Sequence, residues 1–102
     1  MKEIREIAGF IRDELESAED FAWEAAKHKA ELPELASVYQ RMATAKMEHA
    51  EVLYKHGTAL LEEMKRRNDP ETHKCTAVWE FAHEGMLKEM AEVKHMLDVY
   101  KN

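Results

Sequence analysis

Apolar residues recur every three or four positions along almost the whole chain, with charged residues between them. This spacing, about 100° per residue, is that of one face of an α-helix. The apolar positions are Ile4, Ile7, Ala8, Ile11, Leu15, Ala18, Ala22 and Ala25, then Leu35, Tyr39, Met42, Ala43, Leu53, Leu60 and Met64, then Val78, Trp79, Ala82, Met86, Val93, Met96, Leu97 and Tyr100. The pattern predicts an all-α protein with helices over 2–30, 33–67 and 71–101 and without strands.

Two short breaks separate the predicted helices, and both contain residues that favour a helix start. Pro33 suits a first turn, where its missing N–H costs nothing, and Glu34 complements the positive end of the helix dipole. Asp69 is a good N-cap and Pro70 suits the position after it. Such short connections force neighbouring helices to run antiparallel, so we expect one domain, 1–102, with an up-down-up order.

Composition and charge exclude several classes of partner. The chain of 102 residues has 15 basic and 21 acidic side chains, a net charge of −6, and its longest basic run is 65–67. Nucleic acid is therefore not an expected partner. The first residues are charged and no apolar stretch approaches the ~20 residues that span a bilayer, so a cytoplasmic protein without membrane contact is expected. The single cysteine, Cys75, predicts neither an internal disulfide nor a cysteine-rich zinc site.

Three helices of this length make a thin bundle. Trp23 lies away from the main apolar stripe of its helix, which indicates a second contact surface. We therefore expect a homodimer in which helices pair between two chains to complete a larger bundle.

Polar residues also lie in or beside the apolar stripes, where an unpaired charge would be costly. Antiparallel pairing about turns near residues 32 and 69 places these residues in two layers. One layer contains Glu14, Lys46, His49 and Glu89, and the other contains His56, Glu80 and His83. Gly9, Gly57 and Gly85 fall near the second layer, where close backbone packing and a functional role explain a small residue equally well.

Carboxylates and imidazoles that project from facing helices are typical of iron, manganese or zinc sites. Glu80 and His83 form a Glu-x-x-His pair on one helix face. The candidate metal ligands are Glu14, His49, His56, Glu80, His83 and Glu89. A second such pair, Glu92 and His95, points away from the stripe and is predicted to be surface. The alternative is a metal-free polar network that fixes helix register.

Two segments of the sequence resemble ferritin-like di-iron proteins such as rubrerythrin and the encapsulated ferritins. These segments are 14–21 (ELESAEDF) and 46–51 (KMEHAE), and residues 31–49 can be aligned with the family pattern without a gap. Over its full length the chain is similar to small ferritin-like proteins of anaerobic bacteria and their prophages. The resemblance implies a ferritin-like helical bundle, with iron as the implied metal.

The chain departs from that family pattern at one ligand position. Ferritin-like di-iron sites have a Glu three residues before the His of the second helix, and this chain has Lys46 there, before His49. The family's first-helix Glu corresponds to Glu16 by spacing, whereas Glu14 points toward the apolar stripe. One interpretation is that the Lys46 ammonium replaces a metal cation beside Glu14 and Glu89.

Three classes of function stay open on these grounds. The first is a ferritin-like protein that binds iron, manganese or zinc through the candidate ligands. The second is a metal-free bundle that acts through self-association or a protein partner, and its expected sign is a salt-bridged Lys46 with histidines paired to carboxylates. The third is acid–base catalysis by a His and a Glu, which is least favoured because the sequence indicates neither a nucleophile nor an oxyanion hole.

Overall fold

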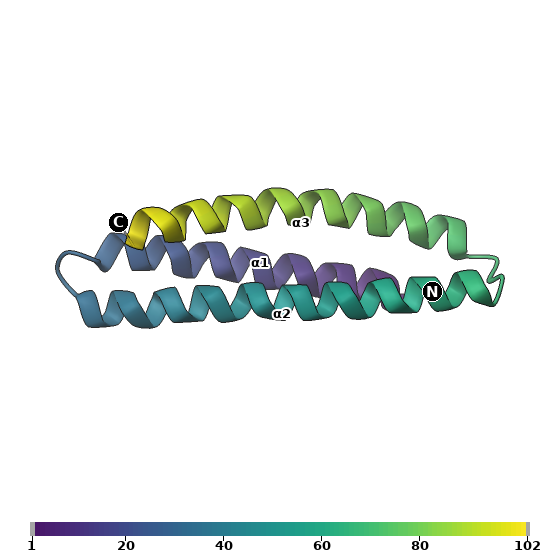
Figure 1. Ribbon diagram of the computed structural model, residues 1–102, viewed down its shortest axis with the longest axis horizontal. Coiled ribbons are helices and arrows are strands. Elements are labelled where there is room, and N and C mark those ends of the chain that lie inside the picture. Colours follow the sequence, from purple (N-terminus) through teal and green to yellow (C-terminus); the bar gives the residue numbers. More distant parts are fainter. Residues whose placement is uncertain (1, 102) are drawn as a thin grey trace.

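A computed structural model describes residues 2–101, which form three α-helices joined by short turns (Figure 1). They are α1 (Lys2–His28), α2 (Pro33–Arg66) and α3 (Thr72–Lys101). The predicted all-α class and the number of helices are confirmed, and each helix end lies within two residues of its predicted position. No helix in residues 2–101 is both long enough and apolar enough to cross a bilayer.

The turn between α2 and α3 is closed by backbone hydrogen bonds around Asn68. This residue has a positive φ of 53°, a conformation that asparagine tolerates better than most side chains. Its N–H donates to the Lys65 carbonyl, and the Asp69 N–H donates to the Met64 carbonyl, so the last carbonyls of α2 are satisfied. The Asp69 carboxylate accepts the Glu71 N–H at 2.8 Å, which confirms the predicted capping role of Asp69.

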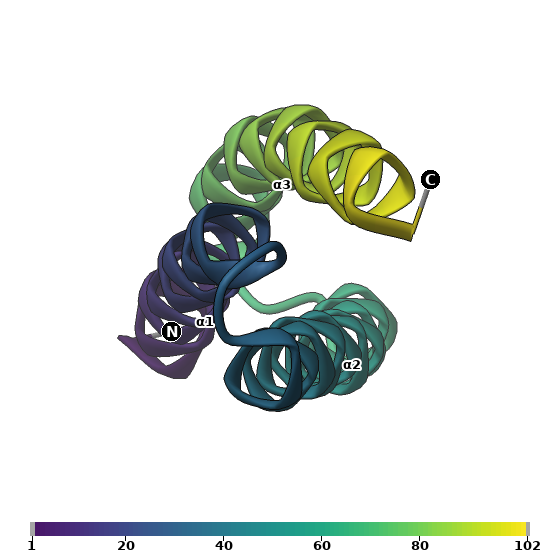
Figure 2. The same cartoon turned by 90° about the vertical axis from the view of Figure 1, so that its left-hand side faces the viewer.

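The three helices form a rod of 56 × 18 × 16 Å. Helix α2 runs antiparallel to α1, and α3 runs parallel to α1 (Figure 1). Viewed along the rod, α2 and α3 pack on different flanks of α1 and diverge from each other (Figure 2). Helix α1 is therefore the central element of the bundle.

All the buried side chains in residues 2–101 are apolar, and on α2 they match the predicted set only in part. Ala43 and Met64 are fully buried as predicted, whereas the buried Met47 and Leu61 were not predicted. Leu35 and Met42, which were expected in the core, are 37% and 40% exposed. Six alanines of α1 and α2 are fully buried, of which only Ala36 and Ala50 were not predicted: Ala18, Ala22, Ala25, Ala36, Ala43 and Ala50. Small side chains let the two helix axes approach closely, and in this packing Leu35 and Met42 are turned outward.

Helix α3 is fixed to α2 chiefly around Trp79. The Trp79 ring is 4% exposed and lies against Gly57, where an added Cβ would come within 2.6 Å of the ring atom Cζ2. The ring stacks on Tyr54 with centroids 5.4 Å apart, and its Nε1–H donates to Thr58 Oγ1 at 3.1 Å. Close packing therefore explains Gly57.

Close packing does not explain Gly9 and Gly85. An added Cβ at either glycine would have no neighbouring atom within 4 Å. Both glycines line a groove between α1 and α3 with a volume of about 460 Å³.

Candidate functional site

Glu14, Lys46 and His49 form a polar cluster between α1 and α2. Glu14 Oε2 lies 3.3 Å from Lys46 Nζ and 3.3 Å from His49 Nδ1. The antiparallel register of α1 and α2 places these residues at one level, as the sequence predicted. The side chains of Glu14 and Lys46 are about one quarter and one third exposed, and that of His49 is more than half exposed. The cluster is therefore at the edge of the core rather than inside it.

One carboxylate oxygen serves both partners in this cluster. The Lys46 ammonium donates hydrogen bonds and has no lone pair for a metal, so it can only take the place of a cation. The ion pair with Lys46 already occupies Oε2 of Glu14, an oxygen that a metal at this place could otherwise bind. The predicted ion pair between Lys46 and Glu14 is thus confirmed.

The predicted contact of Glu89 with this cluster is wrong. Glu14 and Glu19 are five residues apart on α1, which turns them about 140° from each other. Glu14 therefore faces α2, whereas Glu19 faces α3 and lies near Glu89. Because α2 and α3 occupy different flanks of α1, Glu89 belongs to a different cluster.

The second predicted layer, His56, Glu80 and His83, is not assembled. His56 and Glu80 are exposed, whereas His83 is half-buried and stacks on Tyr54 with ring centroids 4.8 Å apart. The packing of Trp79 on Gly57 sets this arrangement, because the next residue, Glu80, is then rotated toward solvent. The buried Nδ1 of His83 has no hydrogen-bond partner in the described part of the chain.

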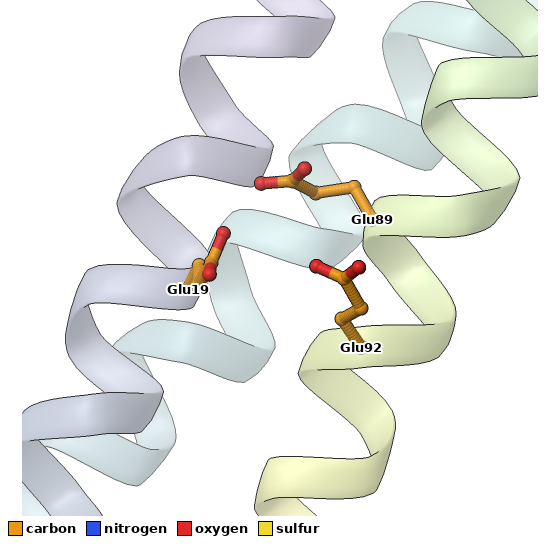
Figure 3. Close-up of side chains that lie close together, drawn as sticks. All are labelled: Glu19, Glu89 and Glu92. Carbon is orange, nitrogen blue, oxygen red and sulfur yellow. The ribbon is translucent and has the colours of Figure 1, made fainter.

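Three carboxylates meet instead between α1 and α3. Glu19, Glu89 and Glu92 each offer an oxygen, and these oxygens lie within 4.8 Å of one another (Figure 3). Within residues 2–101 this is the one group of three or more His, Cys, Asp or Glu side chains that is this compact. Glu19 and Glu89 are half-buried and Glu92 is exposed.

Within this carboxylate cluster, Glu89 has a raised pKa. Burial is the largest cause of a raised pKa at Glu89; together with a side-chain hydrogen bond to Glu19 and the negative charges of Glu19, Glu92 and Glu16, it raises the pKa to about 7. A proton or a bound cation would relieve this repulsion. The arrangement resembles an oxygen-only cation site more than a site with imidazole ligands.

Sequence reasoning missed Glu19 and Glu92. Glu89 and Glu92 are three residues apart and share a helix face, which was a usable signal. The Glu92-x-x-His95 pattern drew attention to a different pairing, and the exposure of both residues agrees with the predicted surface position. The pairing of Glu19 with α3 depends on which flank of α1 carries α3, and the sequence pattern did not indicate this.

The raised pKa of Glu89 predicts that the protein loses stability as the pH rises. The folded state holds this proton more tightly than the unfolded chain, in which a glutamate titrates near 4.5. The stabilisation is thus fully present below about pH 4.5 and is lost as the pH rises through about 7. Thermal midpoints measured between about pH 5 and about pH 8 should fall more steeply for the wild type than for Glu89→Gln. The exposed Glu84→Gln is the control, and equal slopes in all three proteins would contradict the assignment.

Comparisons with known proteins did not assign a family. No family model matches the chain, and no curated protein or solved structure is similar to it at a significant level. What the fold and these clusters define is an elongated all-α protein of three helices, with a Glu–Lys–His cluster on one flank of α1 and a carboxylate cluster on the other.

Proposed function

We propose that this chain is a ferritin-like helical bundle whose Glu14–Lys46–His49 layer works without a metal, and that it acts through association with protein. The observation that carries this proposal is the shared oxygen of Glu14, which lies 3.3 Å from both Lys46 Nζ and His49 Nδ1. A metal ion at this place would have to displace a positive charge. The donor set thus does not fit the di-iron layer that the sequence resemblance implies.

The pairing of two histidines with carboxylates supports the same proposal. His28 pairs with Glu24 at 3.1 Å, one turn earlier on α1, and His49 pairs with Glu14. His56 is exposed, and His83 stacks on an aromatic ring. A salt-bridged Lys46 and a His49 paired with Glu14 are the pattern expected of a structural network that fixes helix register. His83 does not follow this pattern, because its buried Nδ1 has no partner in the described residues.

The carboxylate cluster favours a second candidate function, which is binding of a divalent cation by Glu19, Glu89 and Glu92. The three oxygens lie within 4.8 Å of one another, so modest side-chain movement would bring them to one ion. Ligands that are all oxygen suit manganese, magnesium or calcium better than zinc. In this candidate function the ion would neutralise the cluster and link α1 to α3.

The test of the proposal is to restore the missing ligand type with Lys46→Glu. This variant should gain binding of Zn(II), Mn(II) or Fe(II), because it combines three suitable ligands at one level and removes the competing ammonium. Lys46→Gln, which removes the charge without adding a ligand, should not bind. Binding is measured by elemental analysis of untagged protein and by calorimetric titration, with circular dichroism to check the fold.

The outcomes separate the two candidate functions. The gained binding should disappear when His49→Ala is added to Lys46→Glu. Stoichiometric metal in the wild type that is lost on His49→Ala or His83→Ala would overturn the metal-free proposal. Mn(II) or Ca(II) bound by the wild type, retained in His49→Ala and lost in Glu89→Gln, would instead establish the carboxylate cluster as the functional centre.

A further inference from the structure

Helix α2 carries a second apolar stripe that no part of the described chain covers. Its members follow a strict seven-residue repeat of the coiled-coil type. One set of positions contains Leu35, Met42, His49 and His56, and the other contains Val38, Ala45, Val52 and Ala59. Val52 is 66% exposed, Met42 40%, Val38 39% and Leu35 37%. Helix α2 therefore has two apolar faces, of which α1 covers one.

The stripe differs from the other exposed apolar residues. On α3, Phe81 and Val99 are also exposed, but Lys88 and Glu92 interrupt the face between them. Next to the α2 stripe, α1 extends the apolar surface with Phe10, which is 58% exposed. The contact of Glu14 with His49 places Phe10, one turn away, at the level of Val52.

Four charged residues border the stripe on its solvent side. They are spaced seven residues apart and alternate in sign: Glu34, Arg41, Glu48 and Lys55. All four are exposed, and none makes an ion pair within residues 2–101. If another helix packed on the stripe, these four residues would lie next to the charged residues that flank its own apolar face.

We propose that the α2 stripe binds the α2 stripe of a second copy of this chain, with the two helices antiparallel and a two-fold axis passing between Ala43 and Thr44. This pairing places Leu35 opposite the partner copy's Val52. It also places Val38 opposite the partner copy's His49, and Met42 opposite the partner copy's Ala45. Larger side chains thus meet smaller or half-apolar ones, as interdigitated packing requires.

The flanking charges select this register. Arg41 lies opposite the partner copy's Glu48, and Glu34 lies opposite the partner copy's Lys55, so the two-fold axis generates four attractive contacts. A shift by one seven-residue repeat, to centre the helices near Met47, would place Glu48 against Glu48 and Arg41 against Lys55. Parallel pairing would stack His49 on His49 and would leave these charges without opposite partners.

This inference deepens the proposed function, because it names the protein with which the bundle associates. The first test is the dependence of molar mass on concentration, measured by light scattering and sedimentation. The wild type should be a dimer, and Val52→Glu should raise its dissociation constant by about 100-fold or more, because two charges enter an apolar contact. Val99→Glu, an exposed valine on α3, should leave the dimer unchanged.

Charge exchange tests the register itself. Arg41→Glu and Glu48→Arg should each raise the dissociation constant by about tenfold, and the double variant should recover wild-type association. A monomeric wild type, or a dimer that Val52→Glu does not weaken, would overturn the inference. A dimer that is not rescued by the double variant would overturn the register. In each case the metal-free proposal stands or falls separately on Lys46→Glu.

Discussion

Replacing Trp79 with alanine is expected to lower the free energy of unfolding by about 3–5 kcal/mol. The side chain is 4% exposed, so its removal leaves a cavity in a core that is only a few side chains thick. The variant also loses the stack on Tyr54 and the hydrogen bond to Thr58. The loss is large because Trp79 anchors α3 to α2, whereas the rest of α3 packs on α1.

Urea denaturation followed by far-ultraviolet circular dichroism measures this effect. Phe81→Ala is a matched control, because Phe81 is an aromatic residue two positions away that is 81% exposed. Its replacement should change the free energy of unfolding by no more than about 0.5 kcal/mol. Similar losses in the two variants would show that Trp79 is not the main α2–α3 anchor.

Substitution by alanine is expected to lower the free energy of unfolding at Gly57 and to raise it at Gly9 and Gly85. Gly57→Ala should destabilise the fold by about 1–3 kcal/mol, because the new methyl group would overlap the Trp79 ring. That ring cannot move aside without losing its stack and its hydrogen bond. Gly9→Ala and Gly85→Ala should each stabilise the fold by about 0.5–1 kcal/mol, because alanine favours helix and both sites face open space.

The same denaturation experiment distinguishes the glycines. A destabilising effect of Gly9→Ala or Gly85→Ala would mean that the groove between α1 and α3 is filled in solution. A neutral effect of Gly57→Ala would mean that the Trp79 ring shifts readily.

Local sequence signals were sufficient for the helices and for one polar cluster. The prolines and Asp69 marked the helix starts, because their backbone chemistry acts within a few residues. The short connection between α1 and α2 fixed the antiparallel register, and this register brings Glu14 level with Lys46 and His49. The grouping of these three residues therefore followed from chain geometry alone.

The face of α2 that enters the core could not be predicted in the same way. A helical wheel weights large apolar residues, so it favoured Leu35 and Met42 over Ala36 and Ala50. In the fold, close approach of α1 favours the alanines, and the larger residues form a second stripe. A helix with two apolar faces does not reveal from its sequence which face packs against its own chain.

The placement of α3 decided the remaining differences. The turn at residues 68–71 sets the direction of α3 but not the flank of α1 on which it packs. That choice separates Glu89 from Glu14 and joins it to Glu19, and it also leaves Glu80 in solvent. Long-range packing, with Trp79 against Gly57 as its most specific contact, made this choice.

An odd number of antiparallel helices gives the rod a direction. Helix α1 begins at one end of the 56 Å rod and α3 finishes at the other (Figure 1). Two copies related by the proposed two-fold axis would point in opposite directions. Each end of the pair would then display the start of α1 from one copy and the end of α3 from the other. Such a pair would be bipolar and would present the same surface at both tips, so any ligand that recognises a tip could bridge successive pairs end to end.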